Sequence, residues 1–437
     1  MNNIINHFQS RYPQGHISFV VVACVSLILL VVLKLSTQIQ INRYPEAIYT
    51  LCFLFVVITS KWMIINDRGL HLVFLGCLIP FVLLLINFVL GTDSVYGNFS
   101  ATQLIKLTFF VVIGFWLGGN LNRIHVFLSL SAFGLIISIF QSDFVAEFTR
   151  IIHGKRIDFD LHNAQHTSMF FGLLLIGVFS YINKLPSFNV KSIKSWVILS
   201  VLFFSGVLAI IVVVGAQTRA SWLAIIAIVI IYFALLIKQL NIKLLLISAV
   251  ILLVTSIVIF QFSDTLKKRV KKEVSVVQVF LNKGIDSVPY SSIGIRLHTW
   301  DVALDKILER PFTGFGANVR KSVIQDSDKL PNHIKKNFGH FHNSYIEFTL
   351  AYGLIGLVFL LYIFIWINYR MYQIAKNDNR YKSIWYFTFY GSVFMAVINV
   401  FESYVFFWSG VYSMSILLAP AYSLHLADLY KNKVQNQ

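Results

Sequence analysis

Two arginines and one histidine stand at the ends of apolar segments, where their side chains could take part in chemistry. Arg219 lies in GAQTRASWLAII between two apolar runs, Arg296 stands near the start of a helical segment, and His342 lies where a long polar segment meets another apolar run. A guanidinium offers a planar fork of donors that suits phosphate oxygens, and it stays charged at every relevant pH. An imidazole can take a proton near neutral pH. Together these residue types suit anion binding combined with proton transfer.

Each of the three residues also has a simpler interpretation. Arg219 could be an interfacial arginine whose head group reaches water. Arg296 could be a surface charge beside a helix, and His342 could be an interfacial histidine bonded to a carbonyl. The local sequence leaves both interpretations open, so the decision depends on whether the chain brings the three side chains to one place.

Motifs for several other chemistries are missing from the sequence. The histidines show no HExxH or similar spacing of zinc ligands. There is no G-x-S-x-G, no P-loop and no Rossmann fingerprint. The glycine turn at Gly314 and Gly316 is weak support for phosphate binding. These absences favour a reaction without metal or cofactor over hydrolysis or the use of ATP.

The composition shows which solvent surrounds most of the chain. Of 437 residues, 57% are hydrophobic and 13% are charged, whereas a soluble domain carries about 25% charged residues. Mean hydropathy is +0.73, so lipid is the expected solvent. The formal net charge of +17 would suggest nucleic acid for a soluble protein. Here it indicates Lys and Arg beside anionic lipid, so we expect membrane lipids and no nucleic acid as partners.

Apolar runs of membrane-spanning length recur along the whole chain. Crossing the hydrocarbon core takes roughly 20 apolar residues. Runs that approach this length lie near 17–35, 46–65, 70–90, 101–119, 124–141, 166–183, 195–214, 220–237, 242–260, 346–368, 382–400 and 404–426. The first run is too long for a signal peptide and has no small-residue cleavage site, so we interpret it as a membrane helix.

The positions of Lys and Arg predict the orientation of these helices. One set of alternate short connections, with the two tails, carries most of these residues, whereas the other set carries almost only Arg43 and Arg219. Positive charge collects on the cytoplasmic side, so both termini should be cytoplasmic. Two longer loops, 142–165 and 261–345, then lie outside. This topology places Arg219, Arg296 and His342 on one side of the membrane.

The sequence therefore predicts an all-α polytopic membrane protein with about twelve transmembrane helices and one large, partly helical periplasmic loop. Residues 1–260 would form the first nine helices, 261–345 the loop, and 346–437 the last three helices and a cytoplasmic tail. Inside the loop, the period of Gly294–Arg310 predicts an amphipathic helix. Its apolar face would pack on the membrane surface or on the helix bundle, and Pro311 would end it.

Three segments resemble the O-antigen ligase and polymerase superfamily. They are RLHTWDVALDKILERPFTGFGANV and HNSYIEFTLAYGLIGL in and after the large loop, and TRASWLAII upstream. The resemblance implies a GT-C-like glycosyltransferase of the inner membrane of a Gram-negative bacterium. As O-antigen ligase, it would move a glycan from undecaprenyl pyrophosphate to a sugar of the lipid A–core, without metal or nucleotide.

The resemblance also implies roles for named residues. The essential arginines of the ligases match Arg219 and Arg296, which would bind the pyrophosphate, and the essential histidine matches His342. His342 would activate the acceptor hydroxyl or position it. Asn343 would orient His342 or a sugar. By position alone, His162 and Gln217 are further substrate-binding candidates.

Other functions share part of this pattern. An O-antigen polymerase would use the same donor and arginines but join repeat units, and a protein O-oligosaccharyltransferase would use a Ser or Thr acceptor. A polysaccharide or lipid transporter belongs to a different class. Chain length and loop position favour the ligase over the polymerase. The collection of unusual residues on one face argues against transport.

Overall fold

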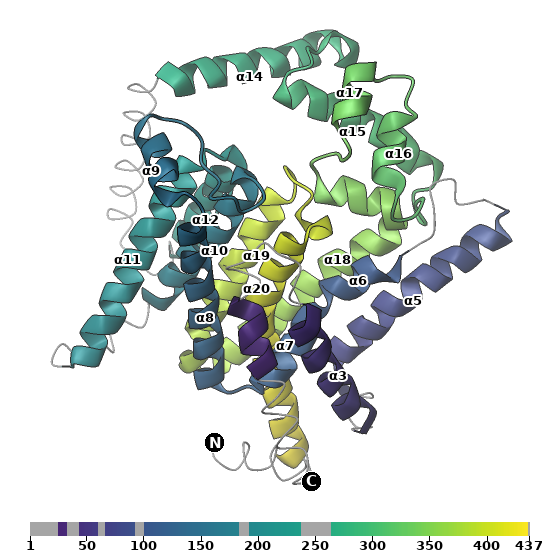
Figure 1. Cartoon of the computed structure of the whole chain (residues 1–437). Helices are drawn as coiled ribbons and strands as arrows, with labels where there is room; N and C mark the ends of the chain where they lie inside the picture. The colour runs from purple at the N-terminus through teal and green to yellow at the C-terminus, as the bar shows by residue number, and fades with distance from the viewer. Residues whose placement is uncertain are drawn as a thin grey trace.

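The computed structural model describes residues 25–32, 43–59, 66–91, 100–182, 192–236 and 264–435. Within these ranges the chain forms helices joined by turns, without a strand (Figure 1). The bundle helices are α3 (Arg43–Thr59), α5 (Arg68–Val89), α6 (Ala101–Leu107), α7 (Phe109–Leu117), α8 (Leu121–Gln141), α10 (Ala164–Ile182), α11 (Ile193–Gly215), α12 (Arg219–Leu236), α18 (Ser344–Asn377), α19 (Lys382–Ile398) and α20 (Trp408–Gln435). The predicted all-α class is confirmed for these residues.

Among the described residues, four helices are long and apolar enough to cross a membrane: α5, α8, α11 and α18. The other predicted runs that the structure describes form shorter or less apolar helices. The run at 101–119 is broken at Thr108 into α6 and α7. Of the run at 17–35 only 25–32 is described, as helix, and the run at 242–260 lies outside the described residues. The total of twelve spans and their orientation stay predictions.

Large apolar side chains cover the outer faces of the long helices. Phe88 of α5 is 82% exposed and Phe204 of α11 is 69% exposed. Contiguous apolar surface of this kind is rare on soluble monomers. In a bilayer the same surface needs no cover, because lipid tails are its solvent. The structure thus supports a helical membrane protein.

Helix α20 forms the centre of the bundle, where it packs against α7, α18 and α19 (Figure 1). In the C-terminal half of α20, the Tyr422 hydroxyl donates a short hydrogen bond to Asp67. Asp67 is fully buried and accepts the Gly69 and Leu70 backbone N–H groups at the start of α5. Burial raises the pKa of the Asp67 carboxyl, although these hydrogen bonds oppose the shift. The contact fixes one end of α5 to the central helix.

The predicted large loop is mostly helical and lies at one end of the bundle, away from the C-terminal half of α20 (Figure 1). It contains α14 (Asp264–Lys283), the short η4 (Ile285–Ser287), α15 (Ser292–Glu309), α16 (Val319–Gln325) and α17 (Asn332–Asn337). The helix predicted at Gly294–Arg310 is confirmed as α15, which ends just before Arg310 and Pro311. It packs against α18 of the helix bundle, which is one of the two predicted alternatives.

The buried face of α15 differs from the apolar face that the helical period predicts, which consists of Leu297, Trp300, Leu304, Ile307 and Leu308. Val302 and Ala303 are buried, whereas Leu304 and Leu308 are 53% and 77% exposed. The small side chain of Ala303 lets the helix backbone approach its neighbours. Trp300 remains part of the packed face, and its Nε1–H donates to the Phe341 carbonyl at 2.7 Å. α15 is therefore attached directly to the segment that carries His342.

A glycine turn after α15 is fastened to a kink in α18. The Phe315 N–H donates to the Leu350 carbonyl at 2.8 Å, and the Leu354 N–H donates to the Pro311 carbonyl at 2.8 Å. At the kink Gly353 has φ 64°. Gly314 has φ +67°, and a Cβ there would lie 2.7 Å from backbone atoms of α18. The turn predicted at Gly314 thus joins the loop to the bundle.

We expect Gly314→Ala to destabilise the fold much more than Gly284→Ala. Gly284 also has a positive φ, +76°, but nothing lies within 4 Å of a Cβ built there. Left-handed strain alone costs roughly 1–2 kcal/mol, and the clash at Gly314 adds about 1–3 kcal/mol. Thermal unfolding of the purified protein in detergent would show the difference as a lower Tm. Equal Tm values for the two variants would show that the turn is not tightly packed.

Candidate active site

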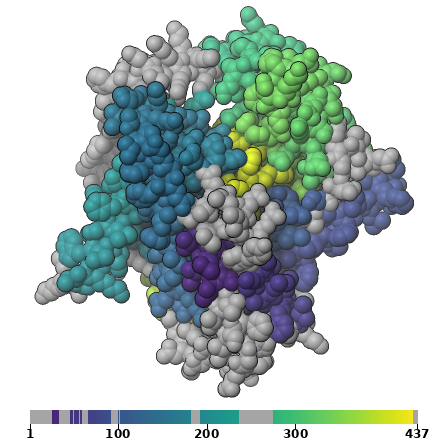
Figure 2. Space-filling model, in the orientation of Figure 1, coloured from purple at the N-terminus to yellow at the C-terminus, as the bar shows by residue number. Residues whose placement is uncertain are grey.

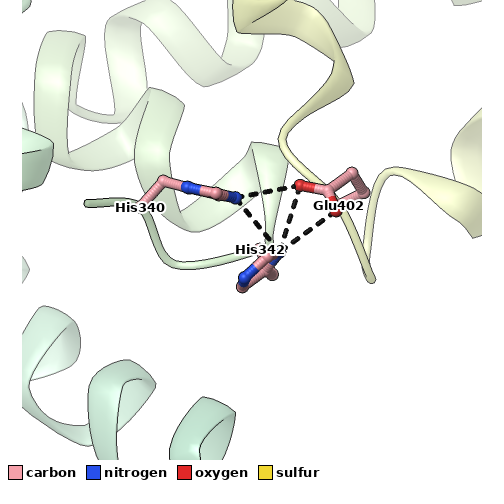
Figure 3. Close-up of side chains that lie close together, drawn as sticks. All are labelled: His340, His342 and Glu402. Atoms are coloured by element: carbon pink, nitrogen blue, oxygen red, sulfur yellow. Dashed lines mark hydrogen bonds and ion pairs between the residues drawn. The ribbon is translucent and has the colours of Figure 1, made fainter. Parts of the chain in front are cut away.

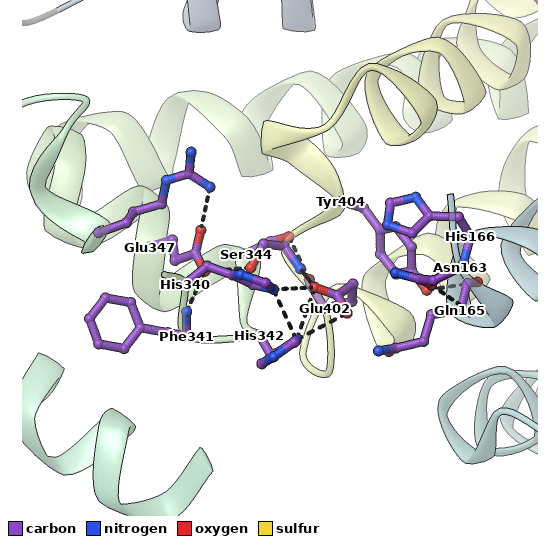
Figure 4. A network of polar contacts seen from close by, with 12 residues as sticks. Asn163, Gln165, His166, His340, Phe341, His342, Ser344, Glu347, Glu402 and Tyr404 are labelled. Atoms are coloured by element: carbon purple, nitrogen blue, oxygen red, sulfur yellow. Dashed lines mark hydrogen bonds and ion pairs between the residues drawn. The ribbon is translucent and has the colours of Figure 1, made fainter. Parts of the chain in front are cut away.

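Four segments from different parts of the chain meet beneath the large loop. They are the connection 153–163, which follows the short helix α9 (Phe144–Ile152), the α11–α12 elbow at 215–218, the segment 338–343 before α18, and the α19–α20 connection at 399–407. Figure 4 shows side chains from the first, third and fourth of these segments in one polar network. In Figure 2, yellow C-terminal residues show between the blue residues and the green residues of the large loop.

His342 and Glu402 form the centre of this network. The His342 Nδ1 lies 3.1 Å from each carboxylate oxygen of Glu402. His340 Nε2 lies 3.3 Å from Glu402 Oε1, and the Glu402 side chain is 2% exposed. Figure 3 shows the three side chains pointing at one another. A segment before α18 and a segment before α20 thus meet through a buried carboxylate.

Glu402 is held in its charged form. Burial by itself would raise the pKa of the Glu402 carboxyl. Hydrogen bonds from His340, His342 and the Ser403 backbone N–H outweigh burial and hold that pKa well below its usual range. An anionic carboxylate facing Nδ1 favours the tautomer of His342 with its proton on Nδ1. The lone pair is then on Nε2, the form in which a histidine serves as a base.

A second buried carboxylate holds the two segments in register. Glu347 of α18 is fully buried and accepts the Phe341 backbone N–H at 2.7 Å. It accepts a short hydrogen bond from the Ser403 hydroxyl and pairs with Arg320 at 3.1 Å. The contacts with Phe341 and Ser403 tie a neighbour of His342 and a neighbour of Glu402 to the same side chain, so Glu347 fixes their separation.

Asn343 has a structural contact in addition to its predicted role. It is buried, and its Oδ1 accepts the Tyr345 and Ile346 backbone N–H groups at 3.0 and 3.1 Å, which makes it the N-cap of α18. The cap places His342 directly before the helix. Asn343 can therefore orient His342 through the backbone at the start of α18, whereas its contact with a sugar stays a prediction.

Arg296 lies on α15, half-buried, within electrostatic range of Glu402, Arg219 and Arg156. Burial lowers the pKa of the Arg296 guanidinium, and the negative charge of Glu402 opposes this shift. The positive charges of Arg219 and Arg156 lower the pKa further. The structure thus places Arg296 within electrostatic range of Glu402 and of the other predicted arginine, Arg219. It adds a third arginine near Arg296, Arg156, which the sequence interpretation did not assign to the site.

Arg219 begins α12 directly after the elbow, and the connection 153–163 is clamped onto that elbow. The Arg156 Nε–H donates to the Ala216 carbonyl at 3.1 Å. The Ile157 N–H donates to the Gly215 carbonyl at 3.3 Å, and the Gln217 Nε2–H donates to the Gly154 carbonyl at 2.9 Å. Gln217 therefore positions the elbow, and its predicted contact with substrate stays a prediction.

His162 joins the site through ring contacts. Its ring centroid lies 4.5 Å from that of His166 and 5.1 Å from that of Phe407. The Phe407 ring also lies 5.8 Å from His340. Phe407 thus links the two groups of histidines, and His162 lies in the same region as the His342–Glu402 pair.

Backbone conformation singles out the same region. The non-glycine residues with positive φ in the described chain are Phe159, Asp160, His162, Gln217 and His342. All five lie in the segments that meet here. Such conformations cost about 1–3 kcal/mol each and cluster at functional sites.

Besides Arg156, the sequence interpretation missed two site residues, Glu402 and Glu347. Glu402 is the only Asp, Glu, Lys or Arg between Lys382 and Asp428, inside an otherwise apolar stretch. An ionisable residue in such a stretch is by default a candidate functional residue, so this signal could have found it. Nothing in the local sequence distinguishes Glu347, because it has the position of an ordinary first-turn glutamate.

We expect Asn343→Asp to keep the stability of the protein and Asn343→Ala to lose about 1 kcal/mol, because Asp replaces Asn as an N-cap and Ala does not. Thermal unfolding of both variants in detergent measures this. A turnover assay on the same samples separates the two roles. Loss of activity in the stable Asp variant would point to a direct substrate contact.

Comparison with known proteins gives one family and two relatives. Residues 204–361 match the family model described as O-antigen ligase, a range that includes Arg219, Arg296 and His342. A Haemophilus influenzae protein named as uncharacterized is 23% identical over 372 residues, 84% of this chain and 88% of that protein. A Rickettsia conorii protein provisionally named a polysaccharide ligase is 25% identical over 130 residues, 28% of this chain and 30% of that protein. The family resemblance expected from the motifs is confirmed.

Proposed function

Because residues 204–361 match the O-antigen ligase family, we propose that this membrane protein transfers O-antigen polysaccharide from undecaprenyl pyrophosphate to a sugar of the lipid A–core. The observation that carries the proposal is the His342–Glu402 pair, with Arg296 within electrostatic range of its carboxylate and Arg219 within range of Arg296. A base and fixed cations are the two requirements of a transfer in which pyrophosphate leaves.

The proposed reaction begins at the acceptor. His342 Nε2 takes the proton of the sugar hydroxyl while the hydroxyl oxygen attacks the anomeric carbon of the donor. Glu402 stabilises the imidazolium that forms, since its carboxylate faces Nδ1. The Nδ1 proton stays in place, so His342 acts as the base and Glu402 holds it in the reactive tautomer.

Bond cleavage at the donor would be supported by the arginines. The bond between the anomeric carbon and the pyrophosphate oxygen breaks, and its electron pair stays on the pyrophosphate. Arg219 and Arg296 would bind the charge that grows there, and both stay ionised throughout. The products are the glycan joined to the lipid A–core and undecaprenyl pyrophosphate.

The position of the site suits two lipid-linked substrates. It lies where the bundle meets the helical large loop (Figure 1), so lipid-borne donor and acceptor could both enter from the membrane. The excess of Lys and Arg in the opposite connections supports a periplasmic location for this end and cytoplasmic termini. The inner membrane of a Gram-negative bacterium meets these requirements.

A complementation experiment tests the proposal. A deletion strain would receive wild type, Arg219→Ala, Arg296→Ala or His342→Ala, and lipopolysaccharide would be separated on a gel. We expect core-only lipid A in the deletion strain while undecaprenyl-linked polymer accumulates, and no rescue by the three variants. A single repeat unit on the core would identify a polymerase instead. Unchanged banding would contradict both, and a transporter or a protein acceptor would become the better explanation.

We expect Glu402→Gln to lower kcat about 10²–10⁴-fold with little change in the KM of the acceptor, because the uncharged amide no longer stabilises the imidazolium. Glu309→Gln is the matched control, since Glu309 is an exposed glutamate that pairs only with Lys306 in the described chain. Steady-state kinetics of both purified proteins measure the effect. Equal kcat values for the two variants would remove Glu402 from the mechanism.

A further inference from the structure

The proposed reaction gives His340 no task beyond its hydrogen bond to Glu402, although this histidine completes a compact set of possible metal ligands. His340 Nε2 lies 3.1 Å from His342 Nδ1 and 3.3 Å from Glu402 Oε1. His342 Nδ1 lies 3.1 Å from the same Glu402 oxygen. In the described part of the chain, these three side chains are the one group of His, Cys, Asp or Glu whose ligand atoms lie close enough together for a single metal ion.

The three donor atoms form a triangle whose size fits a tetrahedral metal site. Zinc binds imidazole nitrogen and carboxylate oxygen at about 2.0–2.2 Å, so neighbouring ligands of a tetrahedron lie about 3.3 Å apart. The sides of the observed triangle are 3.1, 3.1 and 3.3 Å. Two imidazoles and one carboxylate are also a common ligand set for zinc and its neighbours among divalent transition metals.

We propose that His340, His342 and Glu402 form a binding site for one divalent transition-metal ion, and that Zn²⁺ is the ion they bind. The local sequence does not reveal the site, because Glu402 lies 60 residues after His342 and no single motif contains the three ligands. The third ligand comes from a different connection, which the Glu347 contacts hold in place.

Burial and charge around the triangle set the expected strength of binding. Glu402 is almost fully buried, whereas the side chains of His340 and His342 are 29% and 21% exposed, so one side of the triangle is open to a metal ion and a fourth ligand. The positive charges of Arg296, and of Arg219 and Arg156 near it, oppose a dication. Affinity should therefore be moderate and binding reversible.

Metal binding would inhibit the transferase, a consequence that rests on the function proposed above. An ion on His342 displaces the proton from Nδ1 into solvent. The neutral imidazole then carries its single proton on Nε2 and has no lone pair there for the acceptor hydroxyl. The carboxylate of Glu402 is occupied by the same ion. His342 therefore cannot act as the base of the proposed reaction while the metal ion is bound.

Metal binding can be measured without any substrate. Purified full-length protein in nanodiscs would be stripped with EDTA, dialysed and titrated with Co²⁺, whose visible absorption strengthens in a low-coordinate protein site. We expect saturation at one ion per chain and displacement by Zn²⁺. His340→Gln should weaken binding at least about tenfold, since loss of a ligand removes one metal bond. His333→Gln, which removes an exposed histidine elsewhere in the loop, should bind like wild type.

A transfer assay with and without Zn²⁺ tests the inhibition. The ratio of the two rates is compared within each protein, so a change in basal activity does not affect the result. We expect a fall of at least tenfold for wild type, reversal by EDTA, and a ratio near one for His340→Gln.

The outcomes separate this proposal from the proposed function. No saturable Co²⁺ binding, or equal binding by wild type and His340→Gln, would overturn the metal site whatever the protein catalyses. Binding that leaves transfer unchanged would overturn the inhibition. Stoichiometric binding by a protein that proves to have no transferase activity would support the site and contradict only the function.

Discussion

A carboxylate that is nearly closed off from water keeps its charge only where donors surround it, and Glu402 has that environment. His340, His342 and the Ser403 N–H all face its oxygens. The charge therefore holds together two segments that lie far apart in the sequence. The orientation of the His342 ring follows from the same contact, since the carboxylate selects which ring nitrogen is protonated. One contact thus both stabilises the buried charge of Glu402 and orients the ring of His342.

Lipid limits where such a pair can be built. The long helices present apolar side chains to the bilayer, and a charged group on that surface would be costly. Charged side chains that serve chemistry must gather at the helix ends or inside the bundle. Here Arg219 begins α12, Arg296 comes from α15, and Glu402 lies in the α19–α20 connection. The helical loop above the bundle gives these groups partly buried surroundings that bundle ends alone would not provide.

The sequence predicted helix positions and the basic residues better than it predicted their partners. Periodicity found α15 to within two residues at its start. The family motifs pointed to Arg219, Arg296 and His342, whose roles stay predictions. The break between α6 and α7 at Thr108 was not predicted, because the run is apolar on both sides and hydropathy does not register a turn. Glu402 was missed because its importance comes from a contact across 60 residues. Arg156 was missed because its place depends on how the connection 153–163 docks on the elbow. The local sequence can predict which residue types could take part in chemistry, whereas contacts between distant segments can be identified only from the fold.

The left-handed backbone conformations in the site show how the contacts between distant segments are maintained. Gln217 and His342 have φ of 49° and 52°, values that branched or bulky residues seldom adopt. Each is held by a nearby hydrogen bond: Gln217 by its own side chain on the Gly154 carbonyl, and His342 by the cap that Asn343 makes on α18. These contacts hold the strained turns in one conformation, so the adjacent side chains keep fixed orientations. A small change in loop length would keep every one of these residues and would still misalign His342 relative to Arg219 and Arg296, because their mutual geometry is set by the backbone.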